Sequence, residues 1–366
     1  MHPVLQHPPI GRIAVFRALV LGDLLCATPA LRALKAAWPA AELTLIGLPW
    51  ATELAARLTT VDRFEVFPGC SGLPEREPDA DALPGFIARM RARRFDLLLQ
   101  LHGSGRIVNP LLARFGARHV AGFADAGDFS AEPALHTVWP RAGHEIEHLL
   151  RLIDHLELPR QGTQLDLPVT DHDRERLART VPELGPAESF ACVHAGAQLP
   201  SRRWPLERFA AVADKLAASG LRIVLTGAAA ERSLVAELRR LMRAETVDLA
   251  GRTDLFALGA LLERARLLIS NDTGVLHVAA ALGTPSVSVS SGAEVPRWAP
   301  LNASRHHVLW RDLPCRPCAH RECPHGHECA LGVTVHEVNE AARTVIATAV
   351  GVGAGVGVVV GAGVDT

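Results

Sequence analysis

The chain has 366 residues, of which 48% are apolar, so it is long enough for two domains of about 150 to 180 residues with separate cores. Its formal charge of -1 and pI near 7.0 argue against a dedicated nucleic-acid-binding protein, because a polyanionic partner demands a clear basic excess. Residues 1–11 have neither the apolar core nor the cleavage site of a signal peptide. We therefore expect a cytoplasmic protein with no nucleic-acid partner.

Short apolar segments and amphipathic helical segments alternate along the chain, which is the pattern of parallel sheets covered by helices on both faces. The first half is predicted to hold strands at residues 12–17, 42–47, 64–67, 95–101 and 119–121. The second half is predicted to hold strands at residues 190–194, 221–226, 246–249, 266–270 and 285–289. The expected fold is α/β, with two Rossmann-like doubly wound domains that face each other across a cleft.

The domain boundaries follow from where the strong apolar strands stop. We predict an amino-terminal domain at residues 1–168, a proline-containing linker at 169–186 and a carboxy-terminal domain at 187–348. Residues 349–366 are a low-complexity tail of glycine and valine. The uncharged stretch 345–364 is long enough to span a bilayer, but its six glycines favour a frayed tail over a membrane or helix-pairing segment.

Gly22 and Asp23 lie between the first predicted strand and the helical segment that follows it. Ligands of open parallel sheets bind beyond the carboxyl ends of the strands, so Asp23 lies at a position typical of catalytic or ligand-binding residues. Two similar sheets that meet across a cleft would place Asp23 and Asp272 on opposite walls, as suits a two-substrate transferase. The alternative is that Asp23 only caps its helix.

A loop of small residues follows the first strand of the second half. Gly196 lets the backbone approach a ligand closely, and Arg202 and Arg203 precede a helix that begins near Pro205. A guanidinium is a planar fork of donors that pairs with phosphate oxygens, so this loop predicts a diphosphate site. The alternative is an exposed basic loop.

The segment around residues 270–285 is a second strand-to-helix junction in the same half. Asp272 or Thr273 can cap the helix, and the backbone amides from Gly274 onward open it, which makes an anion site. His277 lies four residues after Thr273 and points the same way from the first turn. The alternative is a well-capped junction with a solvated histidine.

Four cysteines lie within fifteen residues, in the pattern Cys315-x2-Cys318-x4-Cys323-x5-Cys329. Closely spaced thiolates favour a tetrahedral structural zinc site, and disulfides are disfavoured in a cytoplasmic chain. We expect a structural zinc here. Reduced, unliganded thiols are the main alternative, and disulfides are the third.

Four groups of residues together resemble one known family. They are Leu21-Gly22-Asp23 with residues 28–34, the mostly apolar segment 95–103, Arg202-Arg203-Trp204-Pro205, and residues 271–285. In their order and spacing they resemble glycosyltransferase family 9, the family of the ADP-heptose:lipopolysaccharide heptosyltransferases. The resemblance implies a two-domain enzyme of the GT-B type that inverts the anomeric centre and needs no metal for catalysis.

The resemblance also implies which substrates the two domains take. The amino-terminal domain would take a lipopolysaccharide or lipooligosaccharide core acceptor at the inner membrane surface, on which the protein would lie peripherally. The carboxy-terminal domain would take a nucleotide-sugar donor, ADP-heptose. Two alternatives remain, a catalytically inactive sugar-nucleotide-binding protein and a GT-B-like sugar-nucleotide epimerase.

The roles of single residues are likewise implied by the family. Asp23 would be the general base that accepts the proton of the acceptor hydroxyl. Arg202 and the backbone amides of Thr273 and Gly274 would hold the leaving diphosphate. Asp272 would hold sugar hydroxyls.

Further donor contacts are expected at His277, which would support the loop or the ligand, and at Glu231, near the nucleoside. Gly22 and His102 are expected to contact the acceptor. Arg106, in an arginine-rich stretch, either belongs to a solvated helix face or meets an anionic acceptor or membrane surface.

Overall fold

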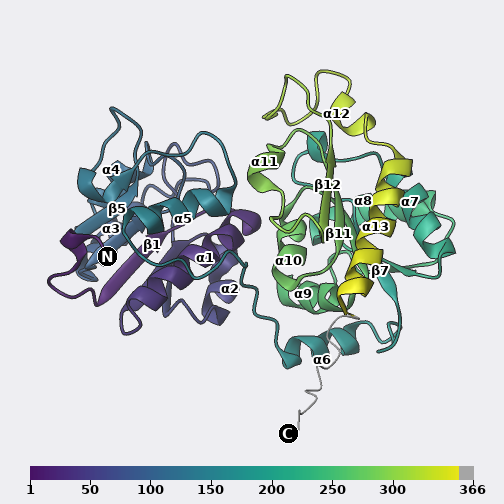
Figure 1. The fold of residues 1–366 in the computed structure, drawn as a ribbon, viewed down its shortest axis with the longest axis horizontal. Helices are drawn as coiled ribbons and strands as arrows, with labels where there is room; N and C mark the ends of the chain where they lie inside the picture. The colour runs from purple at the N-terminus through teal and green to yellow at the C-terminus, as the bar shows by residue number, and fades with distance from the viewer. Residues whose placement is uncertain (354–366) are drawn as a thin grey trace, which may run out of the picture. The chain divides into compact units, whose positions relative to one another are not determined.

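The structure is a computed structural model that describes residues 1–353, and it divides into two compact units (Figure 1). Unit 1 comprises Met1–Pro168 together with Pro296–Trp298. Unit 2 comprises Val169–Val295 and the described chain from Ala299 onward. The predicted two-domain α/β organisation is therefore confirmed, and the division falls between Pro168 and Val169.

Unit 1 contains a six-stranded parallel sheet in the order β3-β2-β1-β4-β5-β6. Its central strands are apolar runs with little polar interruption, as expected when helices cover both faces of a parallel sheet. The strands are β1 (Arg12–Phe16), β2 (Glu42–Gly47), β3 (Arg63–Val66), β4 (Leu97–Gln100), β5 (His119–Phe123) and β6 (His136–Thr137). The helices are η1 (Pro3–Leu5), α1 (Leu21–Ala37), η2 (Pro49–Ala51), α2 (Thr52–Arg57), α3 (Ala82–Ala92), α4 (Val108–Ala113), η3 (Pro133–Leu135) and α5 (Glu145–His155).

One core of unit 1 is built on a chain of aromatic rings. Phe16, Phe67, Phe86 and Phe115 pack edge to face, with successive ring centroids 5.0, 5.9 and 5.8 Å apart. Such pairs add stabilisation beyond their buried area. The rings fix β1 against the loop after β3 and against α3, so the carboxyl end of β1 has a rigid base.

Unit 2 contains a second six-stranded parallel sheet, in the order β12-β11-β10-β7-β8-β9. The strands are β7 (Phe190–His194), β8 (Arg222–Leu225), β9 (Thr246–Asp248), β10 (Leu267–Asn271), β11 (Ser286–Ser290) and β12 (His306–Trp310). The helices are α6 (Asp171–Thr180), η4 (Pro200–Arg202), α7 (Leu206–Ala218), η5 (Ala229–Glu231), α8 (Arg232–Leu241), α9 (Leu255–Arg264), α10 (Gly274–Leu282), α11 (Val295–Trp298, whose last three residues group with unit 1), α12 (Glu328–Leu331) and α13 (Val335–Gly353).

The core of unit 2 lies between its sheet and helices that include α7 and α13. Trp204 is 1% exposed and packs edge-on against Phe209, with ring centroids 5.1 Å apart. The Trp204 indole N–H donates to the Val333 carbonyl at 3.1 Å. Helix α13, yellow in Figure 1, packs against α7 and β11. The Trp-Pro pair that follows Arg202 is thus anchored in the core.

Both sheets have the same strand order, 3-2-1-4-5-6 when each is numbered within its own unit. In such sheets the strand order changes direction between the first and fourth strands, and ligands bind beyond the carboxyl ends of these two parallel strands, at this reversal point. In unit 1 this point lies between β1 and β4. In unit 2 it lies between β7 and β10.

Several segments of the structure differ from what the sequence predicts. The predicted linker 169–186 holds helix α6, which packs on α9 in unit 2 through the Arg174–Glu263 and Arg176–Asp254 ion pairs. Strands β6 and β12 were not predicted, because β6 has only two residues and β12 has histidines at its start.

The predicted low-complexity tail begins inside a helix, since α13 continues to Gly353. The rest of that tail lies outside the described residues. None of the helices within residues 1–353 is both long and apolar enough to cross a membrane.

Candidate functional site

Asp23 is the third residue of α1 and lies just beyond the carboxyl end of β1, at the reversal point of the unit 1 sheet. Its side chain is 20% exposed, and Oδ1 lies 3.6 Å from the Arg17 guanidinium. The Asp23 backbone carbonyl accepts hydrogen bonds from Arg17 Nε at 3.1 Å and Nη2 at 2.9 Å. The carboxylate is therefore held at a helix N-terminus, where the helix dipole favours negative charge.

Burial raises the pKa of Asp23 above its ordinary value, and the positive charge of Arg17 opposes that rise. The negative charge of Glu145 raises it further. A carboxylate whose pKa is raised toward the working pH accepts a proton more readily than an exposed one. This combination suits a general base.

His102 follows β4, the strand next to β1, and is 8% exposed. Burial, with a smaller contribution from the Arg17 charge, lowers the pKa of His102 to about 3, so the ring is neutral near pH 7. Its Nδ1 has no hydrogen-bond partner within the described residues, and Nε2 lies 3.9 Å from Glu75. His102 is thus placed near the carboxyl edge with an unused polar atom.

Gly22 and Arg106 occupy the loops beside the same edge. Gly22 is buried next to Asp23 in the first turn of α1. The Arg106 side chain is 82% exposed and makes a long contact of 4.0 Å with Asp128. Of the predicted acceptor residues, Gly22 and His102 lie at the reversal point, whereas Arg106 lies in the exposed loop after β4.

In unit 2 the loops after β7 and β10 are joined by a buried amide that the sequence analysis did not single out. Asn271 Nδ2 donates to the Ala195 carbonyl at 2.8 Å, and Asn271 Oδ1 accepts from the Trp204 backbone N–H at 2.8 Å. Asn271 is fully buried. Asn271 ties the two predicted donor loops together. The one feature of the sequence that could have indicated this role is its position directly before the Asp-Thr-Gly turn.

Gly196 and Glu231 lie in contact although 35 positions separate them. A Cβ at Gly196 would lie 1.9 Å from Glu231 Oε1, so only glycine leaves room for this carboxylate. Glu231 Oε2 accepts from the Ala228 N–H at 2.8 Å and lies 3.8 Å from His194 Nε2. Burial lowers the pKa of His194, and the nearby Glu231 opposes the change. Gly196 and Glu231, each predicted separately as a donor contact, therefore lie against one another.

Helix α10 begins at Gly274, with Thr273 as its N-cap residue in an extended conformation. The Thr273 side chain makes no cap hydrogen bond, and its buried hydroxyl has no partner among residues 1–353. Asp272 does not cap the helix either, because its Oδ2 accepts from the Ser290 hydroxyl at 2.8 Å. The expected side-chain cap is therefore wrong, and the first amides of α10 are not occupied by either side chain.

His277 lies on the first turn of α10 and is 6% exposed. The alternative of a solvated histidine is therefore wrong. The ring is buried in the first turn of α10.

The two predicted arginines use their guanidinium groups differently. Arg203 donates from Nε and Nη2 to the Ala197 carbonyl, at 3.0 and 2.8 Å, and so braces its own loop. Arg202 donates from Nη2 to the carbonyl of Cys318. Both arginines are half-buried, so the alternative of an exposed basic loop does not fit.

The cysteine-rich segment is bound to the Arg202 loop. The Ser201 hydroxyl donates to the His320 carbonyl at 2.6 Å, and the Ser201 N–H donates to the Arg321 carbonyl at 3.1 Å. The His327 ring lies 2.9 Å from the Ser201 carbonyl. These bonds make the segment a brace for the loop that carries Arg202.

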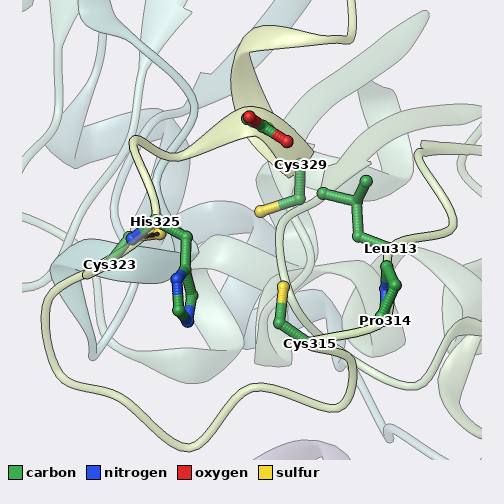
Figure 2. A pocket seen from close by; sticks show the side chains of 7 residues that line it. Leu313, Pro314, Cys315, Cys323, His325 and Cys329 are labelled. Atoms are coloured by element: carbon green, nitrogen blue, oxygen red, sulfur yellow. Dashed lines mark hydrogen bonds between the residues drawn. The ribbon is translucent and has the colours of Figure 1, made fainter.

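Three of the four cysteines, Cys315, Cys323 and Cys329, line one cavity of about 210 Å³. Figure 2 shows how their side chains lie. The lining of the cavity is Leu313, Pro314, Cys315, Cys323, His325, Glu328 and Cys329. The Cys323 sulfur accepts two backbone N–H groups, from His325 at 3.4 Å and His327 at 3.3 Å.

Cys318 is not one of the described residues that line this cavity. Its backbone N–H donates to the Gly292 carbonyl at 2.7 Å, which fixes it beside β11. Within residues 1–353, no group of three or more His, Cys, Asp or Glu side chains is arranged to hold a metal ion. The predicted four-cysteine zinc site is therefore not formed in this structure.

The comparisons with known proteins agree with the geometry. The family model of glycosyltransferase family 9 (heptosyltransferase) matches residues 85–328, more than half of the chain. Lipopolysaccharide heptosyltransferase 3 of Escherichia coli is 24% identical over 309 residues, which cover 81% of this chain and 88% of the relative.

Two solved structures share the fold over nearly the whole chain. A glycosyl transferase family 9 structure from Veillonella parvula DSM 2008 has a TM-score of 0.78 at 22% identity, covering 92% of this chain and 97% of the other. The E. coli ADP-heptose lps heptosyltransferase II has a TM-score of 0.74 at 19% identity, covering 92% and 99%. With two Rossmann-like units and site loops at both reversal points, the chain is a glycosyltransferase of the GT-B type and belongs to glycosyltransferase family 9, the heptosyltransferase family.

Proposed function

We propose that this enzyme transfers a heptose from ADP-heptose to a lipopolysaccharide or lipooligosaccharide core acceptor, with inversion of the anomeric centre. The names of its relatives, which are lipopolysaccharide and lipooligosaccharide heptosyltransferases, support the sugar and the acceptor class. The observation that carries the proposal is the Asp23 carboxylate, held at the end of β1 with a raised pKa.

Asp23 acts as the general base. The acceptor hydroxyl attacks the anomeric carbon of the donor, its proton passes to Asp23, and the nucleoside diphosphate leaves with the bonding electrons. Only a single displacement is needed, so the configuration at the anomeric carbon inverts. The raised pKa of Asp23 helps because a base works best when its pKa lies near the working pH.

Unit 2 binds the donor, and protein groups neutralise the negative charge of the leaving diphosphate without a metal. Arg202 and the first amides of α10, at Thr273 and Gly274, supply positive charge and hydrogen-bond donors. Asp272 accepts from sugar hydroxyls, and Glu231 accepts from the nucleoside. Since Arg203 braces the Ala197 loop, its role is to shape the site rather than to meet the phosphate directly.

Unit 1 binds the acceptor beside Gly22 and His102, and the exposed Arg106 meets its anionic groups. Such an acceptor is held in a membrane, so the enzyme works in the cytoplasm at the inner membrane surface. The neutral His102 ring offers one unused nitrogen to an acceptor hydroxyl.

The substitution Asp23→Asn tests this function. It should lower kcat about a hundredfold or more while the Kd for ADP-heptose stays within about twofold, because only the base is lost. Asp81→Asn is the matched control, since Asp81 is exposed and makes no side-chain cap bond to the described helix α3. Full turnover in Asp23→Asn would refute the proposal, and donor binding with no transfer by the unmodified enzyme would favour an inactive sugar-nucleotide-binding protein.

The diphosphate assignment has its own test. Arg202→Ala should weaken ADP binding by about 1.5 to 3 kcal/mol, the range for hydrogen bonds to charged groups, and should weaken adenosine binding far less. Arg239→Ala, an exposed arginine on α8, is the control. Equal losses for ADP and adenosine in Arg202→Ala would contradict the assignment.

A further inference from the structure

Unit 1 buries an ion pair beside Asp23 that has no role in the chemistry described so far. Arg17 and Glu145 are each 1% exposed, and Arg17 Nη2 lies 2.9 Å from Glu145 Oε1. Charged side chains are rarely buried so completely, because removing them from water is costly unless they are paired. The pair joins residues that are 128 positions apart, at the end of β1 and the start of α5.

Arg17 uses its remaining donors on the backbone around the proposed base. Nε and Nη2 donate to the Asp23 carbonyl, and Nη1 donates to the carbonyl of Leu101 at the end of β4. One guanidinium thus ties together the ends of β1 and β4 and the first turn of α1. The same group lies 3.6 Å from Asp23 Oδ1.

Other charged and titratable groups also face this cluster. Arg297, which belongs to unit 1 in the segment Pro296–Trp298, donates from Nε to Glu145 Oε2 at 2.8 Å. His148 lies 3.8 Å from the same carboxylate. Burial raises the pKa of the Cys26 thiol, and the negative charge of nearby Asp23 adds to that rise. With Asp23 ionised, two guanidinium groups balance two carboxylates.

We infer that Arg17 and Glu145 form a positioning pair for the general base: Arg17 fixes the backbone and carboxylate of Asp23, and Glu145 takes up part of the Arg17 charge. An unpaired guanidinium 3.6 Å from Asp23 would hold the carboxylate so firmly in its ionised form that it would be a weak base. Glu145 reduces that attraction, and Arg17 in turn keeps Asp23 from being neutralised by burial. The inference rests on the proposed role of Asp23.

The pH dependence follows from the signs of these interactions. Asp23 must be ionised to accept a proton, so activity is present above its pKa and is lost as the pH falls through it. Glu145 raises the pKa of Asp23, whereas Arg17 lowers it, although burial is the largest influence. Removing the Glu145 charge should therefore move the acid limb of the kcat profile to lower pH and weaken the base.

The main experiment follows Asp23 directly. The full-length protein is labelled with ¹³C at the aspartate carboxyl carbons, the Asp23 signal is assigned with Asp23→Asn, and it is titrated in the unmodified enzyme, in Glu145→Gln and in Asp62→Asn. Asp62 is the control because it pairs with Lys35 near the other end of α1, at 2.7 Å. In Glu145→Gln the Asp23 titration and the acid limb of kcat should both move to lower pH, and the plateau of kcat should fall about tenfold. Asp62→Asn should leave both unmoved.

The outcomes separate this inference from the function on which it rests. An Asp23 titration that is unchanged in Glu145→Gln would overturn the inference, even if kcat fell. If the Asp23 titration moved while the acid limb of kcat did not, the pairing would be supported and the role of Asp23 as base would be refuted.

A second variant covers the case in which Glu145→Gln does not fold. Arg17→Lys keeps the positive charge but lacks the fork that reaches Asp23, Leu101 and Glu145 together. Its kcat should fall about tenfold to a hundredfold with the donor KM within about twofold, because the base is misplaced while the donor site in unit 2 is untouched. An unchanged kcat in folded Arg17→Lys would overturn the positioning role.

Discussion

The contact between Gly196 and Glu231 allows one substitution to disturb the donor site without touching the base. In Gly196→Ala the new methyl group would start 1.9 Å from Glu231 Oε1, whereas real contacts of this kind are not shorter than 3.0 Å. The carboxylate is the end of a flexible side chain, so it will retreat and the fold will survive. It cannot retreat that far and keep its 2.8 Å hydrogen bond to the Ala228 N–H.

The cost can be divided between stability and binding. Loss of one hydrogen bond at a solvent-exposed position should lower the free energy of unfolding by about 0.5 to 1.5 kcal/mol. If Glu231 accepts hydrogen bonds from the nucleoside, displacing it should cost a further 1.5 to 3 kcal/mol of donor binding, or about tenfold to a hundredfold in Kd. The Asp23 titration, in unit 1, should not change.

Calorimetric titration with ADP and with adenosine measures this, and thermal unfolding measures the stability change. Both ligands should bind more weakly to Gly196→Ala, in contrast to Arg202→Ala, which should affect ADP far more than adenosine. Gly185→Ala is the matched control in the same unit, because a Cβ there meets no atom of the described chain within 4 Å. Binding of ADP to Gly196→Ala at the affinity of the unmodified enzyme would refute the role of Glu231.

Three further predictions concern other groups. Hydrogen bonds from Thr334 and Arg311 hold the pKa of Glu337 at about 2. The stabilisation from the Glu337 carboxylate is therefore present above its ordinary pKa of 4.5 and is lost as the pH falls through about 2. Glu337→Gln should therefore lower the free energy of unfolding by about 0.5 to 1 kcal/mol at pH 7 and by nearly nothing at pH 2, measured by thermal unfolding; an equal loss at both pH values would contradict this. The His102 ring should remain neutral in NMR titrations down to about pH 4, and a midpoint near its ordinary 6.5 would show that the ring is not buried as described. Because Cys318 does not line the three-cysteine cavity, Cys318→Ser should leave the zinc content of the purified protein unchanged; loss of about one zinc per chain in this variant would instead support the predicted four-cysteine site.

The positions of most strands could be read from local sequence. Apolar runs such as residues 190–194 are buried on both faces in a parallel sheet, so composition alone marks them. Segment 169–186 could not be read in this way. Helix α6 is strongly polar, and it is held in place by Leu177, which is 1% exposed, and by ion pairs to α9, which lies about 80 residues further along the chain.

By itself, the sequence determined that Asp23, Arg202 and the Asp272 turn follow strands, because each motif lies in the segment of chain that comes after an apolar strand. Only the tertiary structure decided which distant residues meet. It paired Arg17 with Glu145, placed Glu231 against Gly196 and put Cys315, Cys323 and Cys329, but not Cys318, around one cavity. Such contacts depend on strand order and on the path of loops, and the free energy that fixes them comes from packing between segments far apart in the chain, which no local pattern records.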